Sequence, residues 1–590
     1  MKLTGFLFAA ALLGTCTQPA AEENYTRHVD PKIGTGGHGH VFVGANVPFG
    51  LVQVGPTSIP QTWDWCSGYH ASDSTVIGFS HTHLSGTGIG DLFDVTVMPV
   101  TGDVTYARGE EADPASGLWS YADRTQEIAR PGYYSVPLTR YGIRAELTAT
   151  ARVGLHRYTF PASDAAAVVF DLENGGCWDK ATETHLAKEG DRTVTGWRPS
   201  TGWAKDQRVY FAAEFSKPFE KFETIGDNYA RASFRTTDGE QVSLKVALSP
   251  VSIEGAKANL AAELPGWDFD ATAAAADKAW NDELSKVKIE TEDETSKRIF
   301  YTALYHTMVA PSLFCDVNGD YRGADGKVHE NPGRDTYTTF SLWDTYRAAM
   351  PLMTVLHPER MPDIIQTMLH IADEQGRLPV WHLWGNETDC MVGNPGIVAV
   401  ADAIVKGIGG FDREKAFEAI RKTAMNPDRG NGLRMEYGYI PCEMFNEAVA
   451  YDMEYALADG AAARAAEALG KAEDAKYFEE RSHSYRNYFD PATRFMRGRD
   501  SRKGWRTPFN AFASTHRADD YCEGNAWQYT WLAPHDVKGL EGLFGSRAKM
   551  IEKLDSLFTV SSVIEGGETS PDISGLIGQY AHGNEPSHHI

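Results

Sequence analysis

The chain has 590 residues, of which 42% are hydrophobic and 23% are charged, and its formal net charge at pH 7 is -24. This length exceeds what one hydrophobic core usually serves, so two or more domains are expected. The acidic balance argues against a nucleic acid as partner, because no basic surface is available to displace counterions. The 14 Trp and 25 Tyr residues offer flat apolar faces that suit sugar rings, although most such side chains lie in cores.

Residues 1–21 are predicted to be an export signal. Lys2 precedes a short apolar segment at residues 6–14, which is too short to span a bilayer. The following Leu-Gly-Thr-Cys resembles a lipobox, in which Cys16 would become the lipidated first residue of a bacterial lipoprotein. The alternative is ordinary signal-peptidase cleavage near Ala20 or Ala21. We therefore expect an exported protein, either in the periplasm or held at the outer membrane or cell surface by a lipid anchor.

The first half of the chain is typical of β-structure. Short apolar or alternating segments are separated by Gly, Pro and Asn, as at residues 95–100, 134–138, 167–170, 209–213 and 242–248. Many short strands with turn signals between them predict an antiparallel sandwich or barrel over residues 25–268.

The second half is typical of helices. An Ala-rich segment predicts a helical linker at residues 269–290, and helical periodicity dominates from there to the end. The loops between the predicted helices carry Gly, Asn, Asp and aromatic residues, which favours a toroid of helical hairpins over residues 291–590. The predicted helices are 297–310, 342–356, 358–374, 396–407, 414–425, 446–469, 472–488 and 545–557. These predicted helices are too few to close a barrel made of two concentric rings of helices.

The segment EGNAWQYTW at residues 523–531 is the first candidate for chemistry. Glu523 precedes Gly-Asn on a predicted loop, and the aromatic residues after it start a helix. Apolar surroundings raise the pKa of a carboxyl group, as a general acid requires. The alternative is a carboxylate that caps the helix.

A second candidate is the segment HGNEPSHH at residues 582–589. The oxygen atoms of Asn584 and Glu585 suit Ca²⁺ or the hydroxyl groups of a sugar. The three histidines match no zinc-protease spacing and are read as structural in isolation.

Three further segments carry aromatic and polar residues together. Trp63 and Trp65 are predicted to share one strand face that would suit a stacking platform, and His81 and His83 to share another that is capable of binding a metal. Taken by themselves, both pairs are better explained by ordinary strand packing. The pair Trp343-Asp344 stands at a predicted helix start, where Asp344 either caps the helix or holds sugar hydroxyls.

Taken together, these segments resemble glycoside hydrolase family 92, the bacterial exo-acting α-mannosidases. The agreement runs from VDPKIGTG at residues 29–36 to the last residue and includes WDWCSGYH, GFSHTHLSGTG, FSLWDTYR, EGNAWQYTW, SGLIGQY and HGNEPSHH. The resemblance implies an N-terminal β-sandwich packed on an (α/α)6 barrel, with the active site between them. It also implies calcium-assisted, inverting hydrolysis of terminal α-linked mannose, with α-1,2 linkages a common target, in mannans or high-mannose N-glycans.

The same resemblance implies roles for individual residues. It makes Glu523 the general acid. The terminal mannose is expected to contact the helical domain and two residues of the sandwich, Trp65 and His83. Substrate contacts are expected from Asp344, Trp343, Glu585, Trp65 and His83, and metal contacts from Asn584 and Glu585.

The sequence departs from the family pattern in one respect, and two alternative functions remain open. The family's general base is an Asp in a Gly-Asn-Asp-Cys-Gly-Gln-like motif downstream of HGNEPSHH, and residue 590 precedes it. We therefore expect residues 1–590 by themselves to lack the base and the closing helices of the barrel, and to show no useful turnover. The alternatives are a non-catalytic glycan-binding surface protein, or another glycosidase or phosphorylase with a sandwich and an (α/α)6 barrel.

Overall fold

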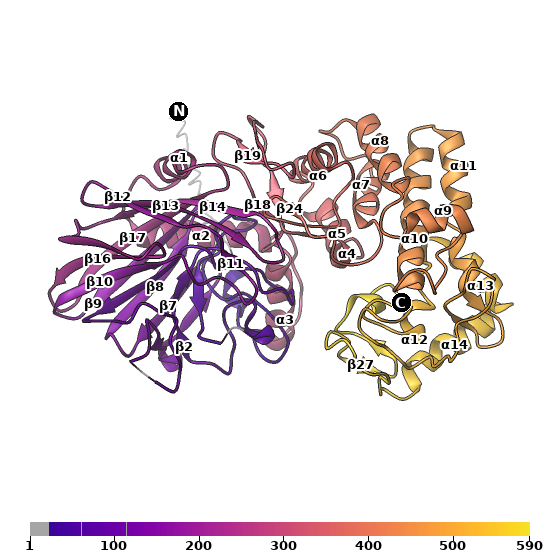
Figure 1. Cartoon of the computed structure of the whole chain (residues 1–590), viewed down its shortest axis with the longest axis horizontal. Coiled ribbons are helices and arrows are strands. Elements are labelled where there is room, and N and C mark those ends of the chain that lie inside the picture. Colours follow the sequence, from indigo (N-terminus) through magenta and orange to yellow (C-terminus); the bar gives the residue numbers. More distant parts are fainter. Residues whose placement is uncertain (1–22, 61, 114) are drawn as a thin grey trace, which may run out of the picture.

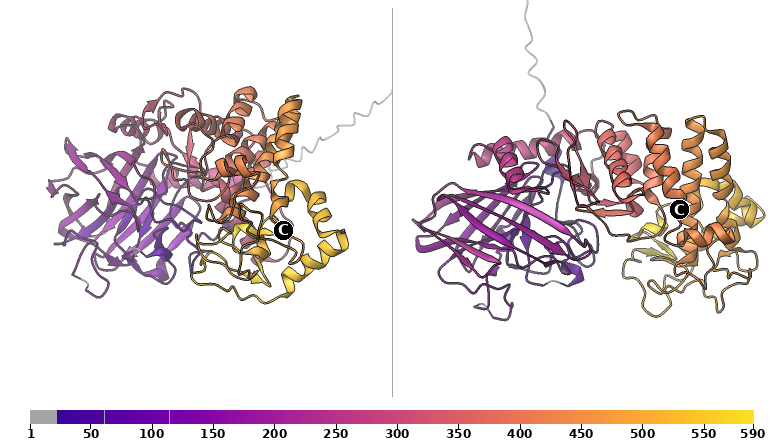
Figure 2. Two further views of the ribbon diagram at one scale, coloured as in Figure 1. Left: turned by 45° about the vertical axis from the view of Figure 1, so that its right-hand side comes forward. Right: turned by 45° about the horizontal axis from the view of Figure 1, so that its top comes forward.

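The computed structural model describes residues 23–60, 62–113 and 115–590, so the predicted signal segment with Cys16 lies outside the described residues. A β-rich N-terminal half and a helical C-terminal half lie side by side (Figure 1), and two further views show the same arrangement (Figure 2). Among the described residues, no helix combines the length and the apolar character needed to cross a bilayer.

The N-terminal half contains two large antiparallel sheets. The six-stranded sheet has the order β1 (Gly55–Thr57), β3 (Gly78–Ser80), β4 (Thr96–Thr101), β10 (Ser163–Asp171), β16 (Tyr229–Thr236), β15 (Lys221–Ile225). The nine-stranded sheet has the order β11 (Lys180–Ala181), β13 (Thr193–Thr201), β14 (Gln207–Phe215), β17 (Glu240–Ser249), β9 (Val153–Phe160), β8 (Ile143–Ala149), β7 (Tyr133–Leu138), β6 (Ile128–Arg130), and β12 (His185–Glu189) also pairs with β13.

The two sheets enclose one apolar core. Along β8, Ile143, Ala145 and Leu147 are buried, whereas Arg144 and Glu146 between them are half-buried, as expected for a strand with one face on a core. Phe170 of β10 stacks on Phe211 of β14 with ring centroids 6.1 Å apart, which joins one sheet to the other. The first half is thus an antiparallel β-sandwich, and it was predicted as a sandwich or barrel.

The C-terminal half is mainly helical, with a few short two- and three-stranded sheets between the helices. The helices are α3 (Glu294–His306), α4 (Leu342–Thr345), α5 (Ala349–Leu356), α6 (Met361–Gln375), α7 (Pro395–Val405), α8 (Arg413–Ala424), α9 (Asn431–Tyr437), α10 (Ala448–Ala468), α11 (Ala472–Arg481), α12 (Ala526–Tyr529), α13 (Val537–Phe544) and α14 (Arg547–Thr559). The Ala-rich α10 is buried on nearly every side and packs against α7 and α11. Small side chains allow that close approach. The predicted order of a sandwich followed by helices is confirmed.

Two helices, α1 (Ile253–Glu263) and α2 (Phe269–Leu284), join the halves. α1 packs on β17 and β14, and α2 packs on β8. The fully buried Trp280 of α2 donates its indole N–H to the carbonyl of Asn46 at 2.8 Å and lies 4.3 Å from the ring of Tyr305 in α3. This contact ties the connecting helix to both the sandwich and the first helix of the C-terminal half.

The predicted helix 342–356 is interrupted. α4 ends at Thr345 and α5 begins at Ala349, with Ala348 in a non-helical conformation at φ -145° and ψ -55°. Arg347 lies in the break, where its Nη2 atom is 2.7 Å from Glu454 of α10. A buried ion pair with a distant helix therefore outweighs the local helical preference.

The pair His81 and His83 belongs to the sandwich core and forms no metal site. The Nδ1 atom of His81 is 2.6 Å from the carbonyl of Val95, and its Nε2 atom is 2.9 Å from Nε2 of His156. The ring of His83 packs between Phe42 and Phe93, and its Nδ1 atom is 2.7 Å from the carbonyl of Gln53. Ordinary packing, the alternative reading, is what the structure contains.

Lowering the pH from 7 to 5 is expected to reduce the contribution of these three histidines to the free energy of unfolding, because they are buried in the neutral form. Burial lowers the pKa of His81 to about 3 and that of His83 to about 4, and it lowers the pKa of His156 well below its ordinary value. An unfolded chain binds protons on histidine near pH 6.5, so below that pH the unfolded state holds more protons and gains stability. Each shifted histidine contributes up to about 1.4 kcal/mol per pH unit in that window.

Urea midpoints at several pH values between 7 and 5 measure this effect. As the pH falls, the variant His83→Asn should lose less stability than the parent protein. The control Gln126→Asn changes an exposed side chain that carries no titratable group and should leave the pH dependence unchanged. An identical pH dependence in His83→Asn and in the parent protein would contradict the prediction.

A buried ion network anchors the loop that follows β10. Arg198 of β13 is fully buried, and its Nη1 atom is 2.8 Å from Asp94 while its Nη2 atom contacts Asp179. Ser200 donates to the other oxygen of Asp179 at 2.6 Å. Removing one partner of such a network leaves an unpaired buried charge, so Arg198→Met should lower the free energy of unfolding by about 3–5 kcal/mol. Urea unfolding followed by tryptophan fluorescence measures this, and a loss below about 1 kcal/mol would show that the network is not required for stability.

Candidate active site

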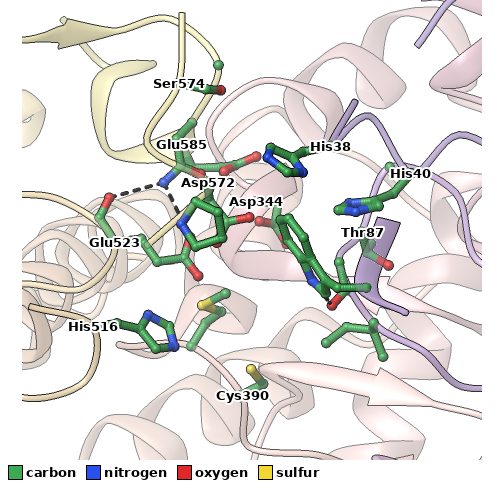
Figure 3. A pocket seen from close by; sticks show the side chains of 18 of the residues that line it. His38, His40, Thr87, Asp344, Cys390, His516, Glu523, Asp572, Ser574 and Glu585 are labelled. Carbon is green, nitrogen blue, oxygen red and sulfur yellow. Dashed lines mark hydrogen bonds between the residues drawn. The ribbon is translucent and has the colours of Figure 1, made fainter. Parts of the chain in front are cut away.

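A cavity of about 1050 Å³ lies between the sandwich and the helical half. Its acidic side chains all come from the helical half, and the sandwich supplies histidines and tryptophans (Figure 3). The lining side chains include His38, His40, Trp63, Thr87, Trp178 and Trp203 from the sandwich, and Asp344, Trp381, Cys390, Arg517, Glu523, Asp572, Asn584 and Glu585 from the helical half.

Glu523 lies on the loop before α12 and is almost completely buried. Its backbone has a left-handed φ of +46°, a conformation that a residue with a Cβ rarely adopts. The cap of α12 is Asn525, which accepts from the backbone N–H of Trp527 at 3.0 Å while Gln528 accepts from the N–H of Asn525 at 2.7 Å. Glu523 is therefore no helix cap, and its side chain faces the cavity instead (Figure 3).

The surroundings of Glu523 favour its protonated form. Burial, followed by the charge of Asp572, raises the pKa of its carboxyl group to about 8. The amide of Asn584 donates to the backbone carbonyl of Glu523 at 3.1 Å and to its Oε2 atom at 3.3 Å. A carboxyl group that is held in place and protonated near neutral pH can donate a proton.

Asp344 lies in the first turn of the short helix α4, and its neighbour Trp343 points away from the cavity. Burial, and then the charges of Glu585 and Glu523, raise the pKa of Asp344 well above its ordinary value. Trp343 is fully buried and is not among the side chains that line the cavity. The guanidinium group of Arg347 lies 4.8 Å from the centre of the Trp343 ring. Trp343 therefore packs at the start of α4 and does not line the cavity.

Asn584 and Glu585 lie where the 3₁₀ helix Glu585–Ser587 begins, next to Glu523. Gln579 connects this segment to the loop of Glu523, because its side-chain oxygen accepts from Asn525 at 2.9 Å. The three histidines of the segment do not line the cavity. His588 is 3.0 Å from the carbonyl of His582, as expected for a structural histidine.

Four carboxyl groups gather in the cavity and would repel one another in their ionised forms. In the described part of the chain, no salt bridge involves Asp344, Glu523, Asp572 or Glu585. Arg347, which lies close by, is already paired with Glu454 at 2.7 Å. Arg517 also lines the cavity, where its Nη2 atom is 3.5 Å from the sulfur of Cys390. Such a site suits a hard divalent cation and a neutral hydroxylated ligand, because carboxylate and amide oxygens are the ligands that calcium takes.

A second acidic cluster lies outside the cavity and does not suit a metal. Glu283, His357 and Glu359 present ligand atoms within 4.8 Å of one another. The ammonium group of Lys286 already lies 2.7 Å from Glu283, 3.2 Å from Nδ1 of His357 and 2.9 Å from Glu359. A lysine therefore supplies the positive charge that a metal ion would bring.

Trp65 and His83, the predicted contacts from the sandwich, do not line the cavity. Trp63–Trp65 is a 3₁₀ turn and no strand, so the two tryptophans do not share a face. Trp63 lines the cavity, whereas Trp65 donates to Asp73 at 3.0 Å and packs on His70. His83 is buried in the sandwich core as described above.

Several lining residues had no clear signal in the sequence. Asp572 stands in a loop without a motif, and Trp178 follows Gly-Gly-Cys in a segment that gave no reason to single it out. Trp203 of the sandwich and Trp381 of the helical half meet edge to face with centroids 4.5 Å apart. These two tryptophans line the same cavity only because the fold brings the sandwich and the helical half into contact there.

The fold and the cavity define a glycoside hydrolase, and comparison with known proteins agrees. Residues 28–249 match the glycosyl hydrolase family 92 N-terminal domain, and residues 255–590 match the glycosyl hydrolase family 92 catalytic domain. The chain belongs to glycosyl hydrolase family 92, which confirms the predicted family and the predicted fold of a β-sandwich followed by an (α/α)6 barrel.

Individual relatives are similar along most of the chain. A family GH92 alpha-mannosidase of Bacteroides thetaiotaomicron, solved with mannoimidazole, is 38% identical with a TM-score of 0.92, over 96% of this chain and 78% of that one. A family GH92 inverting mannosidase of Bacteroides thetaiotaomicron VPI-5482 is 29% identical with a TM-score of 0.84, over 96% and 80%. An uncharacterized secreted glycosidase of Arthroderma benhamiae is 27% identical, over 93% and 76%.

Proposed function

We propose that the protein is an exported exo-α-mannosidase that removes terminal, non-reducing mannose from mannans or high-mannose N-glycans. The observation that carries the proposal is the buried carboxyl group of Glu523, which faces the carboxylates of Asp344, Asp572 and Glu585 in one cavity. Two similar structures are described as mannosidases, one of them as inverting, and a further relative is described as secreted. We further propose inversion and a preference for α-1,2 linkages.

Glu523 would protonate the glycosidic oxygen as the bond breaks. Asn584 holds the Oε2 atom of the carboxyl group at 3.3 Å, which leaves the Oε1 atom for the leaving oxygen. Raising the pKa to about 8 keeps the proton in place at neutral pH until the leaving oxygen gains charge. Glu523 thus supplies the acid half of an inverting reaction, whose other half is a base that activates a water across the ring.

Asp344, Asn584 and Glu585 would hold the terminal mannose and a calcium ion. Their oxygen atoms fit calcium, and neither Asp344 nor Glu585 forms a salt bridge with another described residue. Bound calcium would supply positive charge to the sugar hydroxyls and favour the distorted ring of the transition state. Asp344 and Glu585 would in any case accept hydrogen bonds from hydroxyl groups and so orient the ring.

The proposal is tested by mannose release from α-1,2-, α-1,3- and α-1,6-linked mannobiose in the presence of calcium. The protein for this assay is expressed from its whole reading frame. An α-linked glucobiose is the control substrate. We expect free mannose, fastest from the α-1,2 compound, and NMR should detect the β-anomer first. Release of glucose, or a requirement for phosphate, would favour another enzyme of this fold. Binding of mannobiose without any hydrolysis would favour the glycan-binding alternative.

A further inference from the structure

The cavity has room for more than the sugar that the carboxylates hold. Its volume of about 1050 Å³ lies just above the range of roughly 300–1,000 Å³ that small-molecule sites occupy. All the carboxylates that line it come from the helical half, whereas the facing wall is built by sandwich residues that include His38, Trp63 and Trp178. The volume and the two different walls therefore leave room for a ligand longer than one sugar ring.

Trp178 differs from every other tryptophan of the chain. Its side chain is 46% exposed, whereas every other tryptophan is buried or half-buried. It lines the cavity, but no ring contact or cation involves its indole among the described residues, whereas Trp63 is covered by His38 and His40. A large apolar face is thus left open inside a polar cavity. Single exposed apolar side chains are common on protein surfaces, so this exposure alone does not imply a role.

The backbone that carries Trp178 is firmly held. Its N–H donates to the carbonyl of Gly90 at 2.7 Å, and the N–H of Gly176 donates to the carbonyl of Leu92 at 2.8 Å. A Cβ atom on Gly176 would lie 2.6 Å from the oxygen of Gly90, so the two loops meet at a distance that only glycine permits. On the other side, Asp179 is fixed by the buried Arg198. A ring on a preordered backbone loses little conformational entropy when a ligand covers it.

We propose that Trp178 is a stacking platform for a sugar ring on the leaving-group side of the scissile bond, so that the enzyme prefers α-mannosides of three or more residues to disaccharides. The indole offers a broad, rigid, apolar face to the C–H face of a pyranose ring. The carboxylates fix the terminal mannose on the opposite wall, and the chain of sugars then runs towards the sandwich. This inference rests on the proposed function and names its substrate class.

The test compares α-linked mannobiose and mannotetraose with the wild-type protein and with Trp178→Ala and Trp178→Phe. We expect Trp178→Ala to lower kcat/KM for the tetrasaccharide about tenfold through KM and to leave the disaccharide within about twofold, with Trp178→Phe in between. The matched control is Tyr121→Ala, another exposed aromatic residue of the sandwich at 40% exposure that does not line the cavity. Equal losses on both substrates, or none on either, would overturn the proposal.

Binding separates this inference from the proposed function. Calorimetry on the variant Glu523→Gln should give a lower Kd for mannotetraose than for mannobiose, and adding Trp178→Ala should remove the difference. If the wild-type protein releases no mannose from either compound, the proposed hydrolysis fails, while a length-dependent Kd that requires Trp178 still supports the platform. Equal Kd values for both lengths in the Glu523→Gln variant would reject the platform even if hydrolysis is observed.

Discussion

Replacing Glu523 by Gln is expected to lower kcat for mannobiose hydrolysis by about 10²- to 10⁴-fold, the usual contribution of a general acid. The amide has the same shape and can still accept from Asn584, so KM should change little. What is lost is the proton that the leaving oxygen needs. Initial rates of mannose release over a range of substrate concentrations measure both constants.

The leaving group provides the check on this interpretation. An aryl mannoside whose phenolate leaves readily needs little protonation, so Glu523→Gln should slow its hydrolysis much less than that of mannobiose. The control Glu436→Gln changes an exposed carboxylate of α9 and should retain the wild-type rate on both. An equal loss on both substrates would mean that Glu523 binds the sugar and does not protonate the leaving oxygen.

Removing calcium with a chelator is expected to abolish mannose release, and adding calcium, but not magnesium, should restore it. Burial, followed by the charges of neighbouring carboxylates, raises the pKa values of Asp344, Glu523 and Glu585. A divalent cation would relieve that repulsion, so its binding should also stabilise the fold. At a calcium concentration 100 times its Kd the gain is about 2.7 kcal/mol, which a rise in Tm reports independently of activity.

Two variants locate the ion. Asp344→Asn should reduce the calcium-dependent rise in Tm, because it removes one charge from the cavity. Glu283→Gln alters the cluster that already surrounds Lys286 and should leave that rise unchanged. The reverse pattern would move the metal to the Glu283 cluster, and a Tm that responds to neither calcium nor chelator would contradict calcium binding altogether.

The arrangement of the cavity explains why some of its residues were predictable. Glu523, Asn584 and Glu585 stand in compact polar motifs, and each motif forms a local turn whose shape depends on its own side chains. The Asn525–Gln528 cap is an example, since both of its hydrogen bonds join residues no more than three apart in sequence. Asn584 donates directly to Glu523, and Gln579 hydrogen-bonds both Asn525 and Gln528, so the two motifs are held together. Local chemistry therefore drew attention to these segments, and the resemblance to the family assigned their roles.

The sandwich wall was predicted less well, because its residues depend on backbone geometry that a strand pattern does not reveal. Alternation along a strand put Trp63 and Trp65 on one face, but a 3₁₀ turn has about three residues per turn and rotates them apart. His81 and His83 were predicted to share a face capable of binding a metal, but both rings turn into the core, where they form hydrogen bonds to the carbonyls of Val95 and Gln53.

The sequence by itself determined the order of a β-sandwich and a helical domain, and it brought Glu523, Asp344, Asn584 and Glu585 to attention. Period-2 and period-3.6 patterns and short capping motifs act over a few residues, so they can be read without the fold. The tertiary structure alone decided that Asp572, Trp178, Trp203 and Trp381 complete the cavity. Their roles depend on contacts between segments far apart in the chain, as in the meeting of Trp203 with Trp381 across the two domains.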